Sequence, residues 1–151
     1  MRLRELTTAL LFAAVYMLLL WLFVGYAAAI EIPAWWYPTF GRTGPSAIAW
    51  MQVVHSVGVV AAAVPVAAAI AYFLPQQWLR ITLIAAGFAM AAMLYDALRG
   101  YYLMAQLDAF VVPPRRIVSS AIDVAKVGLL LLLAVWGFTH IVPSNNALER
   151  P

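Results

Sequence analysis

The stretch 9–29, ALLFAAVYMLLLWLFVGYAAA, decides the fold, because it is long, apolar and free of charge. A helix rises about 1.5 Å per residue, so this run is long enough to cross the roughly 30 Å hydrocarbon core of a bilayer. The alternative is a signal peptide cleaved near Ala27–Ala29. Signal peptides have an apolar region of only about 7–15 residues, so we expect an uncleaved span over 6–30.

Three more apolar runs follow, and they predict membrane helices over 46–74, 79–104 and 117–142. The whole chain is 66% hydrophobic and 10% charged. Soluble domains carry about 25% charged residues, so too little polar surface is available here to cover a core in water. The sequence therefore predicts an all-α integral membrane protein. We expect one domain over 1–151, a four-transmembrane-helix bundle with up-down-up-down topology.

Proline and short connections shape the expected bundle. Pro65 lies inside the second run and predicts a kink, since proline frees a carbonyl one turn earlier. The connection Pro75–Trp78 is so short that we expect the spans 46–74 and 79–104 to be antiparallel neighbours. Small residues at four-residue spacing favour close helix contacts. These are Ala63, Ala67 and Ala71, and the pairs Ala85/Ala89 and Gly87/Ala91.

The first connection carries an aromatic group, Trp35-Trp36-Tyr37. Amphipathic rings settle in the headgroup region of a bilayer, which predicts interfacial anchors here. Ordinary aromatic packing over the end of the bundle is the alternative.

Polar residues gather on the side of the membrane where this connection lies. Asp123 and Lys126 lie roughly 9 and 14 Å inside the start of the fourth span, and His55 lies roughly 14 Å inside the second. Charges in hydrocarbon cost roughly 2.5–3.5 kcal/mol, so such residues turn inward and pair. We predict an intramembrane polar cluster in which i,i+3 spacing pairs Asp123 with Lys126 and Asp96 with Arg99. Its core is His55, Asp96, Arg99, Asp123 and Lys126, supported by Gln52, Ser56 and Ser119.

The role of this cluster has three interpretations. The charges can simply mark helix ends, with Lys126 and Arg99 reaching outward to the headgroups. They can form salt bridges that fasten helices to each other or to a partner subunit. They can also form a working site for a proton, an ion or a substrate.

No cofactor and no metal are predicted. The chain has no cysteine, which excludes disulfides, thiol catalysis and thiolate metal sites. The two histidines, His55 and His140, come out roughly 21 Å apart along the membrane normal, so they cannot ligate one haem. A haem with a single histidine ligand stays open as the alternative.

The partners expected from the sequence are the lipid bilayer and other membrane subunits or further copies of the chain. The net charge is +3, but the basic residues are scattered along the chain and form no patch for nucleic acid. We expect a bacterial-type inner (plasma) membrane location. The basic residues are divided about equally between the two sides, but the basic N-terminus and a first connection with only Arg42 favour both termini cytoplasmic.

The function expected first is that of a non-enzymatic accessory or assembly subunit of a larger membrane complex. The soluble parts are too small to act alone, and the small-residue faces offer contact surfaces. The second hypothesis is an oligomeric proton- or ion-coupled transporter that uses the polar cluster. The third is a membrane enzyme acting on a lipid or isoprenoid substrate, although no catalytic motif is present.

The four-span topology makes a direct prediction. Reporter fusions at Gln76 and Pro151 should report the same side of the membrane, and a fusion at Gly41 the opposite side. An even number of spans between Gln76 and Pro151 is required, so a disagreement between those two fusions would contradict the topology.

Overall fold

The computed structural model describes residues 3–106 and 114–141, and this part of the chain is helical with short connections. The helices are α1 (Leu3–Ala28), α2 (Trp36–Phe40), α3 (Gly44–Phe73), α4 (Trp78–Ala105) and α5 (Pro114–Ile141). All except α2 are long and apolar enough to cross a membrane. The predicted all-α bundle of four membrane helices is therefore confirmed, which is the architecture of an integral membrane protein. The predicted end of the last span, Val142, lies outside the described residues.

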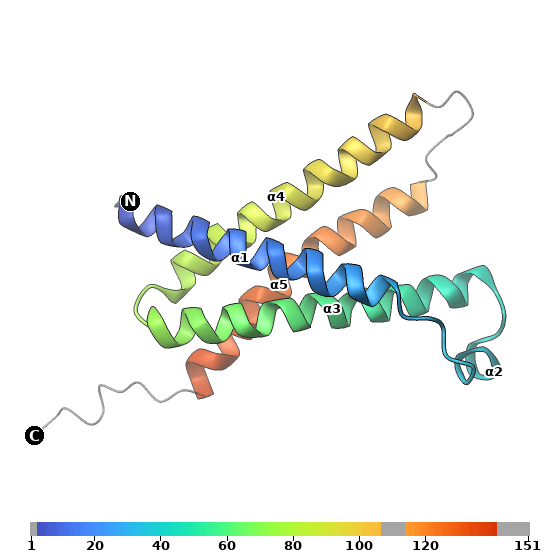
Figure 1. The fold of residues 1–151 in the computed structure, drawn as a ribbon, viewed down its shortest axis with the longest axis horizontal. Coiled ribbons are helices and arrows are strands. Elements are labelled where there is room, and N and C mark those ends of the chain that lie inside the picture. The colour runs from blue at the N-terminus through green and yellow to red at the C-terminus, as the bar shows by residue number, and fades with distance from the viewer. Residues whose placement is uncertain (1–2, 107–113, 142–151) are drawn as a thin grey trace, which may run out of the picture.

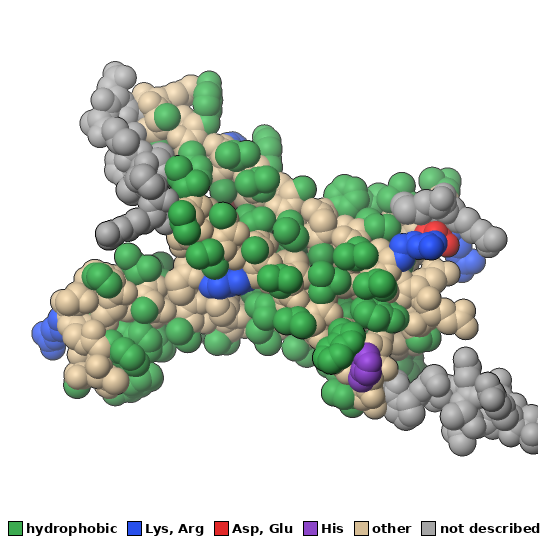
Figure 2. Space-filling model, turned by 180° about the vertical axis from the view of Figure 1, so that it is seen from behind, with side chains coloured by type: hydrophobic (Ala, Val, Ile, Leu, Met, Phe, Trp, Pro, Cys, Tyr) green, Lys and Arg blue, Asp and Glu red, His purple; other side chains and the backbone are tan. Residues whose placement is uncertain are grey.

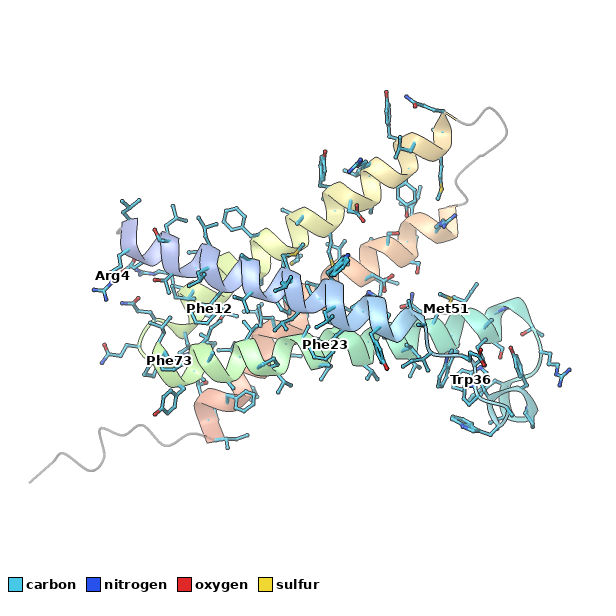
Figure 3. The ribbon with its side chains drawn as sticks, in the orientation of Figure 1. Arg4, Phe12, Phe23, Trp36, Met51 and Phe73 are labelled. Atoms are coloured by element: carbon cyan, nitrogen blue, oxygen red, sulfur yellow. The ribbon has the colours of Figure 1, made fainter. Side chains whose placement is uncertain are left out.

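The long helices form two antiparallel pairs, α1 with α3 and α4 with α5, which cross each other (Figure 1). Contacts between the pairs join α1 to α4 and α3 to α5. We call the end of the bundle with the α3–α4 turn the turn end, and the opposite end the α2 end. Arg4 and Phe73 lie at the turn end, whereas Trp36 and Met51 lie at the α2 end (Figure 3).

The prediction that the second and third spans are neighbours is wrong. Helices α3 and α4 run in opposite directions, but they contact each other far less than either contacts α1 or α5. The turn between them is closed by a hydrogen bond from the Gln77 amide to the Leu74 carbonyl, 3.1 Å. A short turn brings only the ends of two helices together and does not require contact along their length. Here the turn connects the α1–α3 pair to the α4–α5 pair, and α3 and α4 lie diagonally across the bundle.

Close packing is concentrated where glycine removes a side chain. A Cβ on Gly58 of α3 would lie 3.1 Å from the Phe23 carbonyl oxygen and 3.1 Å from Val24 Cα, both in the backbone of α1. A Cβ on Gly128 of α5 would collide with the sulfur of Met90 in α4. These two glycines set the approach within the two antiparallel pairs.

The core occupies the half of the bundle nearer the turn end. It consists of small and branched apolar residues, and across it the Tyr16 hydroxyl of α1 donates a hydrogen bond of 2.8 Å to the Val127 carbonyl of α5. Ala63, Ala67 and Ala71 are buried, as are Ala85 and Ala89. Gly87 and Ala91 face outward instead.

The outside of the bundle is largely hydrophobic, as a lipid-facing surface requires (Figure 2). Two features at the ends anchor the helices. At the turn end, Arg80 of α4 pairs with Glu5 of α1 at 3.8 Å. At the other end, Thr43 caps α3 by accepting a hydrogen bond from the Ser46 amide, 3.4 Å.

Pro65 lies exposed within α3, which runs from Gly44 to Phe73 without a break. The lost backbone hydrogen bond does not end the helix. The kink expected at Pro65 stays a prediction.

The approach of α1 to α3 can be tested at one glycine. Replacing Gly58 by valine should destabilise the protein by about 1–3 kcal/mol, because the new atoms meet backbone rather than a side chain that can move. The measurement is thermal unfolding in detergent.

The matched control is Gly87→Val, because a Cβ at Gly87 has no neighbour within 4 Å. Both changes place valine inside a membrane helix, so helix propensity affects them alike. Equal unfolding temperatures for the two variants would contradict the packing described here.

Candidate functional site

The most connected polar side chain in the membrane-spanning part is Gln52 of α3. Its amide nitrogen donates to Ser119 Oγ at 3.0 Å and to Asp123 Oδ2 at 3.4 Å. Its amide oxygen accepts a hydrogen bond of 2.5 Å from Lys126 Nζ. All three partners lie on α5, spaced so that they share one face. Gln52 therefore links α3 to α5 through hydrogen bonds of both its amide nitrogen and its amide oxygen.

The charges of Asp123 and Lys126 lie side by side within this contact. Lys126 Nζ is 3.5 Å from Asp123 Oδ1, and His55 Nδ1 is 3.6 Å from the same oxygen. The three side chains are between 18% and 25% exposed, so they are largely withdrawn from the surface. The opposite charges compensate each other, which lowers the cost of placing them in the span. We call Gln52, His55, Ser119, Asp123 and Lys126 the polar cluster.

His55 is the member of the polar cluster with an unmet hydrogen bond. Its Nδ1 atom is buried and has no hydrogen-bond partner among the described residues, because 3.6 Å to Asp123 is too long for one. A buried polar atom without a partner is uncommon in folded proteins, which distinguishes His55 from the other members of the polar cluster.

Three predicted members lie apart from the polar cluster. Ser56 donates its hydroxyl to the Gln52 carbonyl of its own helix, 2.7 Å, and adds nothing across helices. Asp96 and Arg99 are both exposed, and no ion pair joins these two described residues. Spacing of i,i+3 brings the two residues near each other along α4, but the structure forms no ion pair between them.

A cleft of about 1010 Å³ opens beside the polar cluster. Its walls come from the last half of α1, the last half of α4 and the first half of α5, and α3 contributes His55. Most of the lining is apolar, and the ionisable side chains on it are His55, Asp96 and Asp123, with Tyr26 and Tyr95. Helices α1 and α4 lie apart at this end, with α5 behind them (Figure 1).

The cleft ends at the packed core. Among the described residues of the turn-end half, the buried side chains are apolar except for the hydroxyls of Tyr16 and Thr82, and each of these is hydrogen-bonded to a backbone carbonyl. The described residues therefore close the cleft toward the turn end.

A second, smaller cavity of about 100 Å³ lies between α1 and α3. Its lining includes His55 and Trp50, and Trp50 Nε1 is the other buried side-chain nitrogen without a described partner. His55 therefore separates the two cavities. Its role as a boundary between cavities was not foreseen from the sequence, because it depends on how the helices diverge.

The predicted interfacial aromatics divide into two kinds. Trp36 is buried, and its Nε1 donates to the carbonyl and the hydroxyl oxygen of Ser46 at 3.0 and 2.9 Å. Its ring lies 5.0 Å from that of Trp50, so it packs over the start of α3. Trp35 is 60% exposed, and Tyr37 is partly exposed beneath Arg42, which lies 5.6 Å from the ring centre. The interfacial role stays a prediction for Trp35 and Tyr37.

Sequence reasoning missed two hydroxyls that join helices. Tyr101 of α4 contacts Ser120 Oγ of α5 and donates to the Arg116 carbonyl at 2.9 Å. Tyr16 makes the buried contact to Val127 across the core. Tyrosines in an apolar run resemble other large core residues, so only their hydroxyls could have drawn attention to them.

His140 lies near the other end of the bundle from His55. It is exposed, and its Nδ1 lies 2.7 Å from the Trp136 carbonyl of the same helix. The two histidines contribute to no common site. Within the described residues no group of three His, Cys, Asp or Glu side chains could hold a metal ion.

Comparison with known proteins gives no relative: no family model, curated protein or solved structure matches the chain. The function must therefore be argued from the polar cluster and the cleft.

Charge compensation in the polar cluster can be tested by restoring it. Asp123→Ala should cost about 1–3 kcal/mol, because Lys126 then keeps only the Gln52 oxygen as a described partner. The cost is below the 3–5 kcal/mol of a fully buried pair, since both side chains keep some exposure. The double variant Asp123→Ala with Lys126→Met should recover much of the loss in a thermal unfolding assay in detergent. If the losses of unfolding free energy caused by the two substitutions simply add in the double variant, the two charges do not stabilise each other.

Proposed function

We propose that this chain is a non-enzymatic membrane protein that binds an amphiphilic molecule in the cleft between α1, α4 and α5. The observation that carries the proposal is the combination of a large apolar cleft with the polar cluster in its wall. Ligand sites are concave, mostly apolar, and contain a few polar groups that orient the ligand. The volume of about 1010 Å³ lies at the upper end of such sites.

Access from the lipid supports an amphiphile rather than a water-soluble ligand. The wall between α1 and α4 is apolar over most of its area and lies in the spanning part of both helices. A molecule dissolved in the bilayer can enter sideways with its apolar part against Leu20 and Met93. Its polar end would then reach Asp123 and His55.

The enzyme hypothesis has less support. Nucleophilic catalysis needs a hydroxyl or thiol held against a base, but no described hydroxyl is hydrogen-bonded to His55. The carboxylate of Asp123 is paired with Lys126 and accepts a hydrogen bond from Gln52, so it is not held against a nucleophile in the described structure.

The transporter hypothesis requires a route to the other side of the membrane. The described core below the cleft is apolar and closely packed, and Tyr16 lies across it. A binding site open to one side fits this arrangement better than a conducting path through one copy of the chain.

An accessory role in a larger complex is the second proposal, and it is compatible with the first. Arg99 lies exposed in α4, and within the described residues it pairs with no acid. An acidic side chain of a neighbouring subunit would satisfy it more specifically than water. Loss of a co-purifying membrane protein on changing Arg99 to Gln, in mild detergent, tests the accessory role.

We also propose a bacterial-type inner membrane location. The basic N-terminus favours an orientation with the turn end cytoplasmic.

Filling the cleft tests the binding proposal. Ala97→Trp adds a large side chain to the lining, whereas Ala91→Trp adds the same side chain on the exposed face of α4, outside the cleft. Native mass spectrometry of the detergent-purified protein should show a retained amphiphile of a few hundred daltons in the unchanged chain and in Ala91→Trp. It should be absent in Ala97→Trp. Retention that is equal in both variants, or absent from the unchanged chain, would contradict the proposal.

A further inference from the structure

We infer that the cleft selects a lipophilic cation, a molecule that combines a positive charge with a large apolar body. This inference rests on the proposed binding function and specifies the chemical class of the ligand. It follows from the charges and the rings that line the cleft.

The charges on the lining are of one sign. Asp96 and Asp123 both line the cleft, and among the described lining residues there is no lysine or arginine. Lys126 lies beside Asp123, but its ammonium group donates to Gln52 on the α3 side of the polar cluster. A charge in an apolar cleft interacts more strongly than in water, because the surroundings screen it less. The cleft therefore attracts a cation and repels an anion such as a lipid phosphate.

Asp96 is the carboxylate with the greater capacity to bind. It is exposed on the cleft side of α4, and none of the ion pairs and hydrogen bonds among the described side chains involves it. Asp123, by contrast, already has Lys126 at 3.5 Å and Gln52 at 3.4 Å. We therefore expect Asp96 to be the carboxylate that meets the ligand, because Lys126 already compensates the charge of Asp123.

Aromatic rings provide the second contribution. Trp21, Tyr26 and Tyr95 line the cleft and are 78%, 77% and 69% exposed. Their faces attract cations, and a diffuse charge on an apolar body loses little hydration on contact with them. Met17 and Met93 also line the cleft, and their flexible thioethers adapt to ligands of different shape.

Two ions of matched size and opposite charge test the inference, tetraphenylphosphonium and tetraphenylborate. Binding is measured by equilibrium dialysis against the detergent-purified full chain, with the value for Ala97→Trp subtracted as the contribution of the micelle. Tetraphenylphosphonium should bind to one saturable site, and tetraphenylborate should show no binding above the Ala97→Trp value.

Single changes then assign the selectivity. Asp96→Asn should weaken tetraphenylphosphonium binding about tenfold, because it removes the carboxylate nearest the ligand. Trp21→Leu should weaken it by a few fold, as expected for one partly exposed ring. Glu31→Gln is the matched control, since it also removes one exposed carboxylate but lies outside the cleft lining, and should leave the affinity unchanged.

The results separate this inference from the proposed function. If both ions bind equally in the cleft, or if Asp96→Asn and Glu31→Gln behave alike, cation selectivity is overturned while amphiphile binding stands. If neither ion binds and no amphiphile is retained by mass spectrometry, both the inference and the proposed function fail.

Discussion

Two opposite charges on one membrane helix constrain the rest of the structure. Asp123 and Lys126 lie in the spanning part of α5, where lipid offers no hydrogen bonds. Gln52 of α3 supplies them, by accepting from Lys126 and donating to Asp123. This contact fixes α3 beside α5, although the two helices are not consecutive. It also holds Asp123 at the wall of the cleft, with Lys126 beside it.

The bundle divides into a packed half and an open half, and the side chains explain the division. Toward the turn end, alanine and valine allow the helices to approach closely, and van der Waals packing holds them together with the hydrogen bond from Tyr16 to Val127. Toward the α2 end, α1 and α4 carry Trp21, Tyr26 and Tyr95, which are too large for such an approach and lie exposed beside the cleft. The open half therefore has room for a ligand, while the packed half closes the route across the membrane.

The sequence predicted the number and the type of the membrane-spanning helices and the approximate position of each, because apolar runs of this length have one stable conformation in lipid. The short helix α2 was not predicted. Helical spacing also placed Ser119, Asp123 and Lys126 on one face, and the cost of charges in lipid predicted that this face would turn toward the interior of the bundle. Which helices lie side by side could not be read in the same way. The short α3–α4 turn was taken to imply contact, but packing at Gly58 and Gly128 joins other pairs. The predicted ion pair between Asp96 and Arg99 is not formed, for a related reason. Spacing of i,i+3 shows that two side chains are near each other along a helix, but it does not show whether their surroundings stabilise an ion pair.

The central claim is a cleft that has the polar cluster in its wall and is closed toward the turn end. Its most direct test is the reaction of Ser120→Cys with a membrane-impermeant cationic thiol reagent, because Ser120 lines the cleft and the chain has no cysteine of its own. Thr82→Cys, at a fully buried position in the packed half, is the control. The structure predicts that Ser120→Cys reacts when the reagent is added on the side of the α2 end and not from the other side, while Thr82→Cys reacts from neither. Equal reaction of Ser120→Cys from both sides, or reaction from neither, would contradict it.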